Sequence, residues 1–259
     1  MIPLSGVRHW LCDMDGVLIL NGQPVPGAKQ FLNCLRERQH SFLIVTNNSL
    51  FTPRQLKHQL GEMGLEIDEN QLWTSALATA HYVQRELPRG TAYVIGQVSM
   101  HEALERVGYR ESVVRPDFVI LAETRDYSFD DFTRAIRLIE KGSRFIATNP
   151  EPTGPSPGGP LPGCGAMAAL IERATGHSAY FVGKPNPVMI LEGLTQLGAH
   201  PDDTVLIGDR METDILAGVR AGLDTILVLS GFASRGDVAN FPFQPTQILD
   251  SVAHIVDRL

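Results

Sequence analysis

Short apolar runs alternate along this chain with longer segments of helical periodicity, and this alternation limits the possible folds more than any other feature. The runs have the length of strands, whereas the segments between them place apolar residues three or four positions apart. This order is typical of parallel sheets, in which a crossover helix returns the chain to the start of the next strand. We therefore predict an α/β protein with strands at Trp10–Cys12, Ser41–Thr46, Ala92–Ile95, Phe118–Leu121, Phe145–Ala147, Ala179–Val182, Thr204–Ile207 and Thr225–Val228.

Helix start and stop signals lie between these runs. Thr52 is a good N-cap and Pro53 suits the first helical position, so a helix is expected to begin there. Gly142 is a typical residue just beyond a helix C-terminus. Helices are predicted within residues 28–39, 53–64, 129–142 and 186–198.

The distribution of polar residues suggests two domains. Candidate functional residues follow the strands near residues 12, 46, 182 and 207, whereas the strands from about 92 to 147 end less distinctively. We predict a Rossmann-like, doubly wound parallel sheet core from both ends of the chain, residues 1–78 and 183–259. A smaller α/β domain, residues 79–182, would be inserted in it. The Pro- and Gly-rich segment 149–165 is predicted to be a loop, either plain surface or facing a substrate.

Composition excludes several classes of protein. The formal net charge is −7 over 259 residues and no Lys/Arg-rich block occurs, which argues against nucleic-acid binding. Cys12, Cys34 and Cys164 are odd in number and form no CxxC pair, which argues against a disulfide framework and favours a reducing compartment. The N-terminus lacks the apolar stretch of a signal peptide, and no run of eighteen apolar residues occurs. We expect a soluble, cytoplasmic protein that does not enter membranes.

Polar residues at the ends of four predicted strands combine into one candidate site. Ligands of open parallel sheets bind at the carboxyl ends of the strands, so these residues would converge if the strands are neighbours. Oxygen ligands without a histidine pair favour a hard ion such as Mg²⁺. A lysine and a hydroxyl could hold the oxygens of a phosphate, so the set favours phosphoryl transfer. The residues are Asp13, Asp15, Thr46, Asn47, Lys184, Asp209 and Asp214.

Four segments in this order, "DMDGV", "TNNS", "GKPNP" and "GDRMETDI", resemble the motifs of the haloacid dehalogenase (HAD) superfamily of phosphatases. The long insertion between the second and third looks like a type IIA cap. The segments "PDFVILAET", "RFIATNP" and "DTILVLSG" are similar to those of NagD-type phosphatases, and the resemblance runs over nearly the whole chain. It implies a Mg²⁺-dependent phosphomonoester hydrolase.

The resemblance also implies a role for each acid of the site. Asp13 would be the nucleophile that forms an aspartyl phosphate, and Asp15 the general acid and then base. The metal ligands would be Asp13, Asp209 and the backbone carbonyl of Asp15. Asp214 would bind the metal or, as we favour, hold Lys184 and a metal-bound water.

Lys184, Thr46 and Asn47 would bind the phosphate group. Lys184 would neutralise both Asp13 and the phosphate, while the Thr46 hydroxyl and the Asn47 backbone N–H would donate to phosphate oxygens. Pro185 and Pro187 restrict the backbone beside the lysine and help to aim its side chain.

The expected substrate is a small phosphorylated metabolite, with a nucleoside monophosphate as the first choice. Sugar phosphates, phosphoglycolate and pyridoxal phosphate are alternatives within the same family. A non-catalytic phospho-acceptor, such as a response-regulator receiver domain, or a binding protein is a remoter alternative. No G-x-G-x-x-G follows the first strand and no P-loop motif occurs, which argues against a dinucleotide- or P-loop enzyme. Pairing of the caps would make a homo-oligomer possible.

Overall fold

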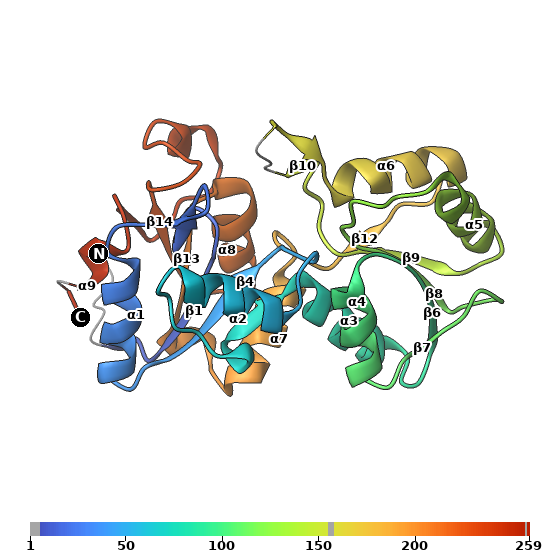
Figure 1. Ribbon diagram of the computed structural model, residues 1–259. Coiled ribbons are helices and arrows are strands. Elements are labelled where there is room, and N and C mark those ends of the chain that lie inside the picture. The colour runs from blue at the N-terminus through green and yellow to red at the C-terminus, as the bar shows by residue number, and fades with distance from the viewer. Residues whose placement is uncertain (1–5, 155–157, 257) are drawn as a thin grey trace. The chain divides into compact units, whose positions relative to one another are not determined.

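The structure, a computed structural model, describes residues 6–154, 158–256 and 258–259 (Figure 1). It contains two compact units. The first comprises the described residues of Met1–Thr46, Pro53–Trp73 and Lys184–Leu259, and the second comprises those of Asn47–Thr52 and Thr74–Gly183. The longer segment of the second unit begins at Thr74. The short segment after Thr46 joins the second unit although its sequence neighbours lie in the first.

The first unit is built on a six-stranded sheet of described residues, in the order β15-β14-β13-β1-β4-β5. The pairings from β15 through β4 are parallel. The chain runs from β1 to one edge and returns later to build the other edge, so the strand order reverses at β1, where sheets of this kind bind ligands. The strands are β1 (His9–Cys12), β4 (Ser41–Thr46), β5 (Leu72–Thr74), β13 (Thr204–Gly208), β14 (Asp224–Val228) and β15 (Gln247–Leu249).

Helices cover both faces of this sheet (Figure 1). Helix α1 packs against α9, and α7 packs against α8 on the opposite face. The stripe of Phe31, Leu32 and Leu35 makes α1 amphipathic, and Trp10 of β1 meets Phe31 edge-on at 5.8 Å between ring centroids. The helices are α1 (Ala28–Glu37), α2 (Pro53–Glu62), α7 (Pro187–Leu197), α8 (Leu216–Ala221) and α9 (Ala253–Val256), with 3₁₀ turns η2 (Glu69–Gln71), η3 (Pro201–Asp203) and η5 (Asp237–Asn240) and the π-helical turn η4 (Met211–Ile215).

The second unit has its own parallel sheet, in the order β12-β9-β8-β6-β7. Helices α3 and α4 pack together, as do α5 and α6, and the second pair buries Phe132 and Ile171 against Val119 and Leu121 of β8. The elements are α3 (Ser75–Glu86), β6 (Thr91–Ile95), α4 (Val98–Arg106), β7 (Arg110–Glu111), β8 (Phe118–Leu121), α5 (Phe129–Glu140), β9 (Arg144–Ala147), α6 (Cys164–Thr175) and β12 (Tyr180–Phe181).

All eight predicted strands and all four predicted helices are present, and the α/β class with a parallel sheet core is confirmed. The predictions missed β5 and β15, which are three residues each, and β7, which is two. They also missed two small antiparallel hairpins, β2 (Ile19–Leu20) with β3 (Gln23–Pro24) and β10 (Thr153–Gly154) with β11 (Leu161–Pro162). The second hairpin lies within the predicted loop 149–165, of which residues 155–157 fall outside the described residues.

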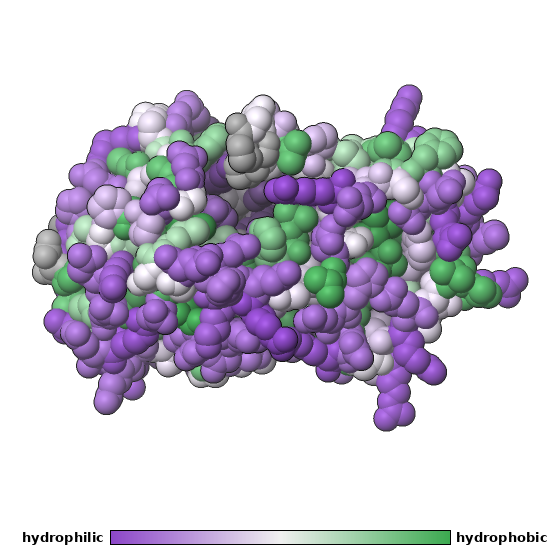
Figure 2. All heavy atoms as spheres, in the orientation of Figure 1, coloured by the Kyte–Doolittle hydropathy of each residue, from purple (hydrophilic) through white to green (hydrophobic). Residues whose placement is uncertain are grey.

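Hydrophilic side chains cover most of the face in Figure 2, with smaller apolar areas between them. Among the described residues, none of the helices combines the length and the apolar character needed to cross a bilayer. Cys12, Cys34 and Cys164 are free thiols, and the first and last of these are buried.

Candidate active site

Three neighbouring parallel strands of the first sheet bring predicted site residues together at their carboxyl ends. Strand β1 pairs with β4 on one side and with β13 on the other. Asp13 follows β1, Thr46 ends β4 and Asp209 follows β13. All three strands run in the same direction, so these residues lie at their carboxyl ends, as predicted.

Lys184 lies buried among the acidic residues at the carboxyl ends of these strands. Its side chain is 3% exposed, and Nζ donates to Asp13 Oδ1 at 2.6 Å, to Asp214 Oδ1 at 2.6 Å and to the Val45 backbone carbonyl at 3.0 Å. These three acceptors match the three N–H groups of an ammonium. Buried lysines require such partners, because an isolated buried charge is very unfavourable. The loop before α7 carries Lys184, and the N-cap Asn186 accepts a hydrogen bond from the Val188 N–H at 3.0 Å.

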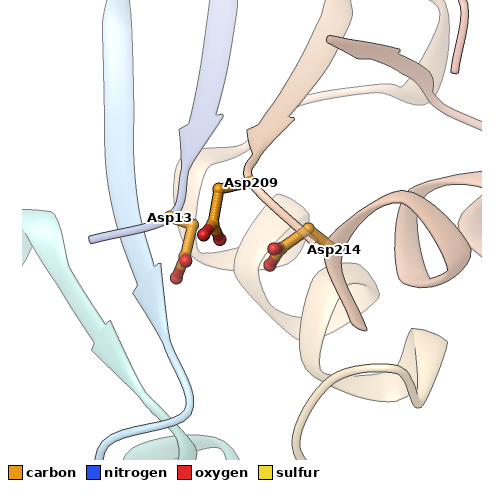
Figure 3. A group of neighbouring side chains, drawn as sticks. All are labelled: Asp13, Asp209 and Asp214. Atoms are coloured by element: carbon orange, nitrogen blue, oxygen red, sulfur yellow. The ribbon is translucent and has the colours of Figure 1, made fainter. Parts of the chain in front are cut away.

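Asp209 and Asp214 are held differently. Asp209 Oδ2 accepts from the Phe232 backbone N–H at 2.7 Å, which leaves Oδ1 without a hydrogen-bond partner among the described residues. Asp214, on η4, uses both oxygens, because Oδ1 accepts from Lys184 and Oδ2 accepts from the Arg210 backbone N–H at 3.1 Å. Figure 3 shows the side chains of Asp13, Asp209 and Asp214 turned toward one another.

Burial sets the protonation of this cluster. It raises the pKa of Asp13 well above the ordinary value, although Lys184 opposes the shift. Burial and, secondly, the charge of Asp214 raise the pKa of Asp209 to about 7. Burial alone would lower the pKa of Lys184, but the carboxylates of Asp13 and Asp214 outweigh it and the net shift is upward. The lysine therefore stays charged, whereas a further cation would favour the ionised forms of Asp13 and Asp209.

The three carboxylates can hold a cation. Each of Asp13, Asp209 and Asp214 offers an oxygen within 4.8 Å of the others. Three ionised carboxylates and one ammonium leave two negative charges, which one divalent cation would balance. Every donor is an oxygen, which suits a hard ion. Asp13 Oδ2 and Asp209 Oδ1 lack hydrogen-bond partners among the described residues, whereas both oxygens of Asp214 are engaged.

Asp15 and Asn47 are among the predicted residues that lie outside this cluster of carboxylates. Asp15 is exposed, and its backbone forms a bridge with Ile19. Its predicted metal contact is the backbone carbonyl, so the direction of the carboxylate does not bear on it. Asn47 is buried in the second unit, where its side-chain amide donates to Glu151 Oε1 at 3.1 Å.

Sequence reasoning missed the backbone groups that fix the acids and the lysine. The N–H groups of Arg210 and Phe232 and the carbonyl of Val45 contact the charged side chains directly. Backbone groups are present at every residue, so no motif marks them. The segment "DTILVLSG" gave the nearest sequence signal. It ends just before Phe232, and its Ser230 Oγ donates to the Gly16 carbonyl at 2.7 Å.

Comparisons with known proteins agree with this geometry. A family model described as haloacid dehalogenase-like hydrolase matches residues 10–110, and a HAD-hydrolase-like model matches residues 181–255. A dihydroxyacetone phosphatase of Corynebacterium glutamicum (strain R) is 49% identical over 248 residues, 96% of this chain and 90% of that protein. The chain belongs to the haloacid dehalogenase superfamily.

Within this superfamily the chain is a phosphatase of the NagD-like subfamily. The ribonucleotide monophosphatase NagD of Escherichia coli (strain K12) is 40% identical over 249 residues, 96% of this chain and 98% of that protein. The solved structure of E. coli NagD matches with a TM-score of 0.91 at 39% identity, covering 95% of this chain and 97% of that one. The resemblance stated from the motifs is thus confirmed, and the segments matched by the two HAD family models contain Asp13, Lys184, Asp209 and Asp214.

Proposed function

We propose that this HAD phosphatase hydrolyses small phosphate monoesters with Mg²⁺, through an aspartyl phosphate on Asp13. The observation that carries the proposal is the buried contact of Lys184 Nζ with Asp13 Oδ1 at 2.6 Å, beside Asp209 and Asp214. This contact favours an ionised Asp13 in a place where burial opposes ionisation. A carboxylate held in this way can act as a nucleophile toward phosphorus.

Two displacements at phosphorus make up the proposed reaction. An oxygen of Asp13 attacks phosphorus, the bond from phosphorus to the ester oxygen breaks, and Asp15 gives its proton to the leaving oxygen. Asp15 then takes a proton from a water molecule, whose oxygen attacks the phosphoryl group. The bond to Asp13 breaks, and inorganic phosphate leaves. The exposure of Asp15 suits this role, because a general acid must reach the leaving group.

The remaining residues bind and orient the phosphate. The Thr46 hydroxyl and the Asn47 backbone N–H would donate to phosphate oxygens. Lys184 would hold Asp13 charged, and Asp214 would orient Lys184 through their 2.6 Å contact. Mg²⁺ would be held by Asp13, Asp209 and the Asp15 carbonyl, where its charge would neutralise the phosphate. The engagement of both Asp214 oxygens supports an orienting role for this residue rather than direct metal binding.

We propose dihydroxyacetone phosphate as the first substrate to test, since the relative that is 49% identical is named for it. Ribonucleotide monophosphates are the second candidate, supported by NagD at 40% identity. The test is a panel of these esters, sugar phosphates, phosphoglycolate, pyridoxal phosphate and p-nitrophenyl phosphate, with kcat/KM measured for each. Turnover of none of them with Mg²⁺ present would refute the proposed activity.

Removal of divalent cations should abolish turnover. The charge left on the acidic cluster and the raised pKa of Asp13 both require a cation before Asp13 can attack. We expect EDTA to reduce p-nitrophenyl phosphate turnover to background, and excess Mg²⁺ to restore it. Full activity after exhaustive chelation and dialysis would show that the carboxylates act without a metal.

Gly16→Ala should damage the site directly. Gly16 has φ +78°, and an added Cβ would overlap the carboxylate of Asp209. Gly222→Ala is the matched control, because Gly222 has φ +76° with open space around it. Both variants should lose about 1–2 kcal/mol of stability from the left-handed backbone, measured by urea unfolding. Only Gly16→Ala should also lose most of its activity and Mg²⁺ affinity. Equal activity in the two variants would contradict this prediction.

A further inference from the structure

The second unit contains a network of buried polar residues. Several of them lie at or next to the points where the chain passes from one compact unit to the other. The chain crosses after Thr46, after Trp73 and after Gly183, as well as after Thr52. Asn47 and Gly183 stand at two of these crossings, and Ser75 lies one residue past a third. The residues covalently next to Asn47 and Gly183 are Thr46 and Lys184, which belong to the candidate site.

Asn47 is held through both its backbone and its side chain. Its carbonyl accepts from Ser75 Oγ at 2.6 Å and from Asn149 Nδ2 at 3.0 Å. Its side-chain amide donates to Glu151 Oε1 at 3.1 Å, and the Glu151 N–H in turn donates to Asn149 Oδ1 at 3.1 Å. Two donors on one carbonyl, together with a fixed side chain, leave Asn47 little rotational freedom.

Gly183 completes the network from the other crossing. Its N–H donates to the Thr148 carbonyl at 2.7 Å. A Cβ at Gly183 would lie 2.6 Å from Asn47 Oδ1 and would also overlap the Thr148 carbonyl, so only glycine allows this close approach. The residue before Lys184 is therefore packed directly on the residue after Thr46.

Ser75 and Asn149 are fully buried, yet the proposed chemistry uses neither. Burying a polar side chain is unfavourable unless it is hydrogen-bonded, and apolar residues would fill the same space without that constraint. The hydrogen bonds from Ser75 and Asn149 hold the Asn47 carbonyl in one orientation, which apolar side chains would not do. Fully satisfied buried networks rigidify the segments that they join.

We infer that Ser75 and Asn149 are positioning residues for phosphate binding. They fix Asn47, whose N–H shares a peptide group with Thr46, so that the hydroxyl and the N–H stay directed at the same phosphate oxygens. The packing of Gly183 on Asn47 ties the backbone of Lys184 to the same point. The inference rests on the proposed function, because it assumes that Thr46 and Asn47 bind the phosphate.

Ser75→Ala tests this with a closely matched control. Ser143 lies in the same unit, is also buried, and also donates to a backbone carbonyl, that of Pro116, at 2.6 Å. Ser75→Ala and Ser143→Ala should therefore lower Tm by similar amounts. Only Ser75→Ala should raise KM for p-nitrophenyl phosphate and the inhibition constant of inorganic phosphate, by about fivefold for one lost hydrogen bond. Ser75→Thr, which keeps the hydroxyl, should recover both constants.

The outcomes separate this inference from the proposed function. If the wild type hydrolyses p-nitrophenyl phosphate and Ser75→Ala keeps both constants within twofold, the inference alone is wrong. It is also wrong if Ser143→Ala loses as much phosphate affinity. If Ser75→Ala does not fold, Asn149→Asp, which replaces the amide donor to Asn47 by an oxygen, must raise the same two constants. A wild type that hydrolyses no ester overturns the proposed function and this inference together.

Discussion

Replacing Asp13 with asparagine should abolish turnover and leave the protein at least as stable as the wild type. Asparagine has nearly the same volume but cannot form the aspartyl phosphate, so kcat on p-nitrophenyl phosphate should fall by roughly 10³-fold or more. Burial raises the pKa of Asp13, which means that the folded protein disfavours its charge. Removing that charge should not lower the urea midpoint measured in EDTA, because Lys184 keeps Asp214 as a partner.

The same chemical change on the surface is the control for Asp13→Asn. Asp202 is exposed in η3 of the same unit, so Asp202→Asn should change neither kcat nor the urea midpoint appreciably. An Asp13→Asn variant with near-normal kcat would remove Asp13 as the nucleophile. A variant that loses activity only because it unfolds would show a lowered midpoint, which the charge argument excludes.

Replacing Lys184 with methionine should be the most destabilising substitution in the site. Methionine fills much of the same space, but Asp13 and Asp214 then lose their common cation in a buried place. Breaking a buried ion pair in this way lowers the free energy of unfolding by about 3–5 kcal/mol. We expect this loss in urea at pH 8 with EDTA, together with loss of most activity.

Lys57→Met is the matched control, because Lys57 contacts Asp68 at 3.0 Å on the surface of the same unit. An exposed ion pair contributes only about 0–1 kcal/mol to stability, so Lys57→Met should have little effect.

The destabilisation caused by Lys184→Met should also become smaller as the pH falls from 8 toward 5.5. Over that range Asp209, with a pKa of about 7, takes up a proton, which removes one of the negative charges that the lysine helps to balance. Equal stability of Lys184→Met and wild type at pH 8 would contradict this account.

The core strands and helices could be predicted because each carries a strong local signal. Thr204–Ile207 is a run of buried residues, and Pro187 marks the start of α7. Strands β5 and β15 were missed because each is short and lies at an edge of the sheet, where it pairs on one side only. The assignment of residues 47–52 to the second unit was equally hidden, since it rests on contacts of Ser49 with Glu123 and Thr148.

The candidate site was predictable in its residues and less so in its contacts. Residue type and position at strand ends were enough to bring Asp13, Lys184 and Asp209 together. Spacing alone left two roles open for Asp214, and only the hydrogen bonds to both of its carboxylate oxygens favour the orienting one. Asn149 lies 102 positions from Asn47, to which it donates, and neither Ser75 nor Asn149 is an unusual residue type in its local sequence.

The central position of β1 in its sheet has a consequence for folding during translation. Its neighbour β4 leaves the ribosome soon after it, but its other neighbour, β13, follows about 190 residues later. At a synthesis rate of about 5–20 residues per second, the side of β1 that pairs with β13 stays unpaired for about 10–40 s. Residues 74–183 form a continuous stretch that can become compact during this interval. Nascent chains should therefore expose an apolar strand edge until late in translation, which makes them candidates for chaperone binding and sensitive to the speed of synthesis.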